Sequence, residues 1–271
     1  MANTVDILGD DAVMDSIITR TITEIVDDNA TKVGTHAFNG CSKLESANFP
    51  KATNVGAYSF SNCTALTTAN FPLASKELGN SAFSGCTKLK AVNIPSATSI
   101  GQNAFSGCTS LESVVFPNAT TFARHAFSGC TKLKTVDAGF TEIYVGFAEN
   151  ASKPCSSLDT LILRSETMCT MNASYYFNNT AIGAGTGYIY VPAALVDQYK
   201  AASVWSTYAS QIRAIEDYPE ITVDFNAVTE IATGQFKATS ITNANFPACK
   251  TIGNSAFQSC NGLTTADFPV C

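Results

Sequence analysis

Ten cysteines and two histidines are the residues of this chain whose types could support metal binding, disulfide formation or nucleophilic chemistry. Five of the cysteines recur at a regular spacing, as Cys41, Cys63, Cys86, Cys108 and Cys130. A structural zinc site needs clustered thiolate and imidazole ligands, and no C-x-x-C pair with histidine partners is present. The sequence therefore predicts neither a metal nor a cofactor.

The regular cysteine spacing leaves disulfides to be considered. Adjacent coils of a repeat protein could bring two cysteine Cα atoms within the roughly 4.4–6.8 Å that a disulfide spans. Five side chains that point in parallel cannot all pair, however, and a buried cysteine packs well as a small apolar residue. We predict buried free thiols in this column, whereas the state of four cysteines outside the strict column stays open: Cys155, Cys169, Cys249 and Cys271.

The two histidines and the recurring F-S-G-C segment are the remaining candidates for catalytic groups. His36 and His125 occupy the same position beside an Ala-Phe pair, 89 residues apart, so they belong to different repeats and cannot form one site. The F-S-G-C segment is not the G-x-S-x-G elbow of hydrolases. Because catalysis needs one unique constellation, a motif that recurs with variants from unit to unit argues against it. The sequence predicts no catalytic residue and a protein that is not an enzyme.

These cysteines lie in a tandem repeat of about 22 residues. The phenylalanines mark its period: Phe38, Phe60, Phe83, Phe105 and Phe127 follow one another at steps of 22, 23, 22 and 22. An L-x-x-A/V-x-F/I-P segment in each unit alternates like a short strand that proline ends. The A-F-x-G-C segment is typical of a short helical turn ended by glycine. Units of this kind stack on their neighbours as a solenoid.

The unit VGTHAFNGCSKLESANFPKATN, which begins at Val33, and its successors to about Glu142 resemble the BspA-like leucine-rich repeat family, with signature I-G-x-x-A-F-x-G-C-x-x-L-x-x-V-x-x-P. The pattern resumes at TIGNSAFQSC from Thr251. The resemblance implies an α/β leucine-rich-repeat solenoid, right-handed, with a parallel β-sheet on the concave face and short helical turns opposite. It also implies a role in adhesion or recognition, in bacterial surface proteins or in phage-borne ones.

Departures from the repeat divide the chain into five predicted segments. These are an N-terminal capping coil (1–32), the regular array (33–142), degenerate coils (143–186), a strand–helix cap element (187–217) and a second short array (218–271). The cap is predicted because Pro192 ends a strand and starts a helix, and Trp205 begins an amphipathic face. The second array stops at Cys271 partway through a coil, which predicts either truncation or self-association into homo-oligomers through the open coil.

Composition and charge exclude several classes of partner. The net charge is −6 and only 14% of the residues are charged, with no basic run. Nucleic acids and anionic membrane surfaces both need clustered lysine and arginine, so neither is an expected partner. No apolar stretch approaches the roughly 20 residues of a membrane helix. The chain as given begins without a signal peptide, and we expect a location in a virion, at a cell surface or outside the cell.

The candidate binding surface consists of the strand side chains that point outward on the concave face, because solenoids usually bind through this face. Asparagines recur there and then give way to valine and aspartate. One interpretation is a solvated face with a short amide ladder, and the other is a shallow ligand surface of small polar groups. No aromatic cluster is expected on this face. The candidate ligand-binding residues are Glu45, Asn48, Thr68, Asn70, Lys90, Asn93, Glu112, Val115, Lys134 and Asp137.

The leading functional hypothesis is a non-catalytic binding or adhesion protein, specifically a phage or prophage tail-associated recognition protein. The repeats, rich in threonine, asparagine and alanine, resemble the versions that phages carry. The alternatives are a BspA-type adhesin of the bacterial cell surface and a self-associating structural module. The expected partner is a host or cell-surface protein or glycan.

Overall fold

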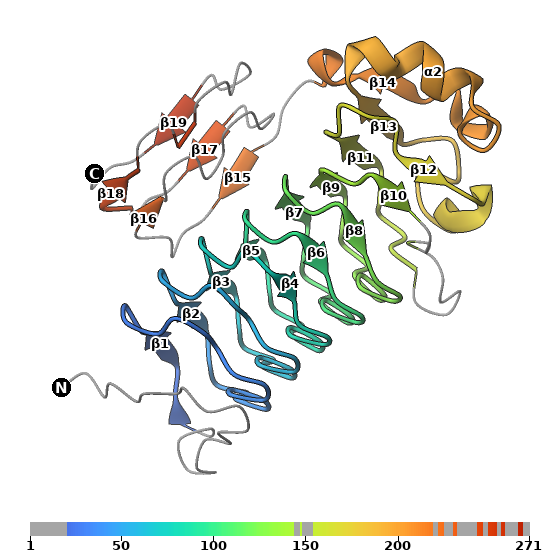
Figure 1. Cartoon of the computed structure of the whole chain (residues 1–271). Helices are drawn as coiled ribbons and strands as arrows, with labels where there is room; N and C mark the ends of the chain where they lie inside the picture. The colour runs from blue at the N-terminus through green and yellow to red at the C-terminus, as the bar shows by residue number, and fades with distance from the viewer. Residues whose placement is uncertain are drawn as a thin grey trace.

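The computed structural model describes residues 21–143, 147 and 154–218, and in the last part of the chain 222–224, 230–231, 243–245, 249–253, 256–257 and 265–267. Within these residues the chain winds into a parallel-stranded solenoid with little helix (Figure 1). The predicted solenoid is confirmed. Residues 1–20 of the expected N-terminal coil and the terminal Cys271 lie outside the described residues.

Each coil contributes one short strand to the inner edge of an arc (Figure 1). The first four strands form one parallel sheet: β1 (Glu24–Val26), β2 (Ser46–Asn48), β3 (Thr68–Asn70) and β5 (Ala91–Asn93). The next five form another: β7 (Ser113–Phe116), β9 (Thr135–Ala138), β11 (Thr160–Leu163), β13 (Tyr188–Val191) and β14 (Ile212–Ala214). Equivalent residues of successive repeats pair in register, as Ala47 does with Ala69.

A second row of two-residue strands runs beside the first. One sheet joins β4 (Glu77–Leu78), β6 (Ser99–Ile100) and β8 (Thr121–Phe122), and another joins β10 (Glu142–Ile143) with β12 (Thr170–Met171). Within the described part of the last array, the same arrangement returns. There β15 (Thr222–Asp224), β17 (Asn243–Asn245) and β19 (Thr265–Asp267) form one sheet, and β16 (Glu230–Ile231) pairs with β18 (Thr251–Ile252).

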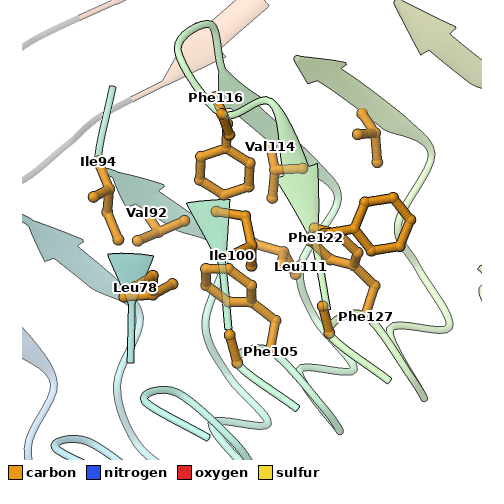
Figure 2. Packing of buried hydrophobic residues seen from close by; sticks show 14 of the residues in the cluster. Leu78, Val92, Ile94, Ile100, Phe105, Leu111, Val114, Phe116, Phe122 and Phe127 are labelled. Carbon is orange, nitrogen blue, oxygen red and sulfur yellow. The ribbon is translucent and has the colours of Figure 1, made fainter. Parts of the chain in front are cut away.

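Phenylalanine stacks form the centre of the core. Phe60 lies 5.0 Å from Phe38 and 5.3 Å from Phe83 by ring centroids, with the rings nearly parallel. Side chains from both rows of strands meet these rings inside the coil, as Figure 2 shows for Ile100 and Phe116 around Phe105. Each coil therefore buries its apolar residues against the coils on either side. This packing explains why a sequence with few charges forms an ordered solenoid.

The A-F-x-G-C segments are series of tight turns rather than helices. In the first unit Ala37, Asn39 and Cys41 each donate a backbone hydrogen bond to the residue three positions earlier. His36 (φ 60°) and Gly40 (φ 77°) have left-handed backbone conformations, which interrupt a helix. The amides of His36 and Gly40 are thereby freed to bond the next coil, so the turns add inter-coil hydrogen bonds.

The cysteine column joins neighbouring coils through thiol–carbonyl hydrogen bonds. The Cys63 thiol donates to the carbonyl of Phe38 at 3.1 Å, and the pattern continues to Cys155, whose thiol donates to Phe127 at 2.9 Å. Cys155 is therefore a sixth member of the column. The cysteines of the column are buried free thiols, as predicted, and the open question is answered in the same way for Cys155 and Cys169. Cys249 is buried as well.

The segment 187–217 closes the end of the first array. It contains β13, β14, the helix α2 (Val196–Ala201) and three short 3-10 helices, η2 (Ala193–Leu195), η3 (Trp205–Tyr208) and η4 (Ile215–Asp217), and it follows η1 (Ser174–Phe177). Trp205 is 2% exposed, and its indole donates to the Cys169 carbonyl at 2.8 Å. The Trp205 ring also packs on Phe177 at the end of the phenylalanine stack, so the core does not end on an open coil.

Candidate functional site

The inner face of the long strands, called the sheet face below, carries two parallel rows of side chains. Because strand residues alternate between the two sides of a sheet, the residues on either side of each buried core position point to this face. One row contains Glu24, Ser46, Thr68, Ala91, Ser113, Thr135, Thr160 and Tyr188. The other contains Val26, Asn48, Asn70, Asn93, Val115, Asp137, Ile162 and Tyr190.

Three asparagines of the second row form an amide ladder. The Asn70 side-chain nitrogen donates to the Asn48 oxygen at 2.7 Å, and the Asn93 nitrogen donates to the Asn70 oxygen at 2.5 Å. The predicted ladder is confirmed, but the expectation that it is solvated is wrong, because these residues are 2–7% exposed. Side chains one coil apart shield one another, so the ladder joins the coils instead of displaying amides.

Beyond the asparagines, the second row contains a buried valine and then an aspartate in a buried ion pair. Val115 is 8% exposed, and Asp137 is fully buried. The Arg164 guanidinium binds both Asp137 carboxylate oxygens, with 2.7 Å between Nη2 and Oδ2. The Asp137 carboxylate is thus already engaged within the chain.

The other predicted site residues are accessible. Thr68 is partly exposed on β3, and four residues that precede strands are exposed along one border of the sheet face: Glu45, Lys90, Glu112 and Lys134. The structure therefore leaves five of the ten predicted residues available to a partner and buries the other five. Their role in ligand binding stays a prediction.

An aromatic cluster occupies the last part of the sheet face, where the sequence led us to expect none. Tyr188 is 43% exposed, and the Arg213 guanidinium carbon lies 5.1 Å from its ring centroid. Tyr190 lies 6.3 Å from Tyr188 and meets Tyr218 edge-on at 4.7 Å. We call Tyr188, Tyr190, Arg213 and Tyr218 the tyrosine cluster. Tyrosine and arginine are the residue types that dominate binding surfaces.

Burial sets the protonation of the cluster. It raises the pKa of Tyr190. The neighbouring Tyr218 and Tyr188 raise this pKa further, whereas the Arg213 charge lowers it. Burial also raises the pKa of Tyr218, although hydrogen bonds with the Thr135 and Thr160 hydroxyls lower it. The Tyr190 and Tyr218 phenols therefore stay neutral near pH 7, where each hydroxyl can both donate and accept a hydrogen bond.

The sequence pattern contained one signal for this cluster. In Gly187-Tyr-Ile-Tyr-Val-Pro192, the two tyrosines alternate with apolar residues, which places both on one side of a strand. Which side they face follows from the pairing of β13 with β11, where Tyr190 lies beside Ile162. The repeat has decayed over 143–186, so the sequence does not reveal this register.

A cleft of about 760 Å³ lies near the other end of the sheet face. It is lined by residues of β1 and β2, by residues of the stretches that follow β1, β2 and β3, and by two residues of the last array, Lys250 and Thr251. Two exposed apolar side chains, Val26 and Leu73, share its lining with charges of both signs. This cleft is a second accessible surface at the N-terminal end of the solenoid.

The remaining chemical groups do not come together. Among the described residues, no three histidine, cysteine, aspartate or glutamate side chains are grouped so that they could hold a metal ion. His36 stacks on Tyr58 at 4.8 Å, which is a packing role. None of the described helices has both the length and the apolar character needed to cross a membrane.

Stacked coils with one long strand each, stacked core phenylalanines and a sheet that lines the inner face define a leucine-rich-repeat solenoid. The family model described as "BspA type Leucine rich repeat region" matches in six copies, over residues 9–134, 78–186 and 214–270. These matches cover most of the chain, which therefore belongs to the BspA-type leucine-rich repeat family.

Solved structures of bacterial repeat proteins are similar to this chain. A leucine rich cell surface protein of Faecalibacterium prausnitzii A2-165 is 16% identical, with a TM-score of 0.37, over 89% of this chain and 77% of that chain. The pneumococcal vaccine antigen PcpA is 17% identical, with a TM-score of 0.47, over 71% of this chain and 42% of that chain. A leucine-rich repeat protein of Bacteroides ovatus ATCC 8483 is 20% identical, with a TM-score of 0.35, over 90% and 78%. No curated protein sequence matches significantly.

Proposed function

We propose that this chain is a non-catalytic recognition or adhesion protein that binds a host or cell-surface protein or glycan through its sheet face. The tyrosine cluster carries the proposal, because it displays aromatic and guanidinium groups on a rigid sheet. Parallel strands on both sides hold β13, so little ordering of the backbone is needed when a partner binds. Membership in an adhesion-type repeat family supports the same conclusion.

The state of the nucleophilic groups supports a non-catalytic role. Thiols along the column donate to backbone carbonyls, and burial raises the pKa of Cys155 to about 12. A thiol with so high a pKa is not a nucleophile near neutral pH, since the thiolate is the reactive form. The two histidines lie in separate coils, so neither can activate a shared nucleophile.

The proposed setting is a phage or prophage particle, with the protein associated with the tail and facing the host. The threonine-, asparagine- and alanine-rich repeats resemble phage-borne members of the family and favour this setting. The alternative setting is a bacterial cell surface. Neighbouring genes for tail or capsid proteins would support the first, and a signal peptide in the complete reading frame would support the second.

Binding of the fluorescently labelled chain to bacterial and host cells and to extracellular-matrix proteins tests the proposal. The variant Thr68→Arg/Ser113→Arg adds two bulky cations to the sheet face. The matched control Ser84→Arg/Ser106→Arg adds the same charge to two partly exposed serines of the A-F-x-G-C turns. We expect the first variant to weaken binding at least tenfold and the control to change it less than twofold. Equal effects of the two variants would refute binding through the sheet face.

A further inference from the structure

We infer that the tyrosine cluster is a subsite for a neutral, polyhydroxylated ligand, namely an uncharged saccharide unit of a surface glycan. This inference rests on the proposed function and names the chemical class that the sheet face binds. It follows from three properties of the cluster: an accessible ring, a solvent-accessible hydroxyl without a partner among the described residues, and a balance of charges.

Tyr188 supplies the accessible ring. Its side chain is 43% exposed, while the Arg213 guanidinium occupies a position over the ring. Arg213 is itself held in place, because its Nη1 donates to the carbonyls of Ser210 at 2.7 Å and Ile212 at 3.0 Å. Its other N–H groups can then donate to ligand hydroxyls beside a ring whose electron-rich face attracts polarised C–H groups.

Tyr190 supplies a hydroxyl that the described part of the chain leaves available. The residue is 7% exposed, yet its hydroxyl forms no hydrogen bond with any residue that the structure describes. Its oxygen is not fully buried, so a ligand can reach the hydroxyl from solvent. A phenol that both donates and accepts is suited to a ligand hydroxyl, which does the same.

The charges around the cluster decide between ligand classes. Arg213 and Asp217 act on the Tyr190 phenol with opposite sign, the first lowering its pKa and the second raising it. Asp159 lies close enough to Tyr218 to act on that phenol too. A strongly anionic ligand would meet the carboxylates and a strongly cationic one would meet Arg213. Neutral hydroxyls can accept from the guanidinium and donate to the carboxylates at the same time.

A printed array of neutral and charged glycans, followed by calorimetry on each hit, tests the inference. We expect the native chain to bind neutral oligosaccharides, Tyr188→Ala to weaken that binding at least about tenfold, and Tyr190→Phe to weaken it about threefold or more. Tyr175→Ala is the matched control, because this tyrosine is 62% exposed but lies on η1, away from the strands. We expect it to leave the affinity within twofold of native.

Salt provides a second readout. Binding of a neutral ligand should change less than twofold between about 0.05 and 0.5 M NaCl, whereas a bound ionic ligand would lose affinity through screening. Tyr190→Phe removes one oxygen and should keep the native melting temperature, so its effect on binding is separable from folding.

The inference is overturned by any of three results: no neutral glycan bound, binding confined to charged glycans, or equal effects of the variants at Tyr188 and Tyr175. Failure of this inference can be distinguished from failure of the proposed function. If cells or matrix proteins still bind and Thr68→Arg/Ser113→Arg still abolishes that binding, only the saccharide assignment fails. If neither that variant nor Tyr188→Ala weakens the binding of cells or matrix proteins, the sheet face itself is not the binding surface.

Discussion

Replacement of the middle asparagine of the amide ladder should destabilise the solenoid more than replacement of all three. Asn70→Val removes the partner of the Asn48 oxygen and the partner of the Asn93 nitrogen, both at buried residues. A buried polar group that loses its partner costs about 1–3 kcal/mol, and the added apolar burial returns about 1 kcal/mol. Because two such groups are affected, we expect the free energy of unfolding to fall by about 1–5 kcal/mol.

The triple variant Asn48→Val/Asn70→Val/Asn93→Val removes the amides together and leaves none without its ladder partner. It also creates a continuous valine row, because Val26 and Val115 already occupy this row at the two ends of the ladder. Replacing both partners of a hydrogen bond by apolar groups is close to neutral. We expect the triple variant to be less destabilised than the single one, by at least about 1 kcal/mol.

Urea unfolding followed by far-ultraviolet circular dichroism measures both variants, and unchanged m values confirm that the same surface is exposed. Amide hydrogen exchange then locates the loss, which should concentrate in β2, β3 and β5. If Asn70→Val is neutral, or if the triple variant loses as much as three independent substitutions would, the ladder does not act as a connected unit.

Other predictions follow from the glycines, the cysteines and the cap. Gly79→Ala should cost at least about 2 kcal/mol by urea unfolding, because its Cβ would lie 2.4 Å from the backbone of the preceding coil; Gly40→Ala, in open space at φ +77°, should cost less, and the reverse order would contradict the stacking. Trp205→Ala should cost about 3–5 kcal/mol, and a loss below about 1 kcal/mol would show that the cap is dispensable. The folded state should weaken from pH 9 upward, because burial raises thiol pKa values above the ordinary 9.0, so only the unfolded chain ionises easily there. Each such thiol lowers the free energy of unfolding by about 1.4 kcal/mol per pH unit above pH 9. Cys108→Ser should reduce the slope of stability against pH by that amount, and an unchanged slope would contradict the prediction. The thiols in question are Cys108, Cys130, Cys155 and Cys169.

Much of the fold can be predicted because the same residue pattern recurs in successive repeats and fixes which residues align between coils. Phe60 and Cys63 have equivalents one period away on both sides, so stacking follows from sequence spacing alone. The form of the turns was less predictable, since left-handed conformations at His36 and its equivalents are held by inter-coil hydrogen bonds that span two repeats.

The candidate site was only partly predictable. The position of Asn70 on the sheet face follows from strand alternation, but its burial depends on the neighbouring asparagines, which are distant in sequence. Tyr190 lies where the repeat has decayed, and only strand pairing shows which face it joins. Tyr218 packs against it from beyond β14, a contact that no local pattern indicates.

Hydroxyl-radical footprinting of the labelled chain, free and bound to target cells, tests binding through the sheet face most directly. Three exposed tyrosines report on different surfaces: Tyr188 on the sheet face, Tyr58 on the turns and Tyr175 on η1, with exposures of 43%, 42% and 62%. We predict that bound partners protect Tyr188 from oxidation and leave the other two unchanged. Protection of Tyr58 or Tyr175 with Tyr188 still oxidised would contradict the proposed binding surface.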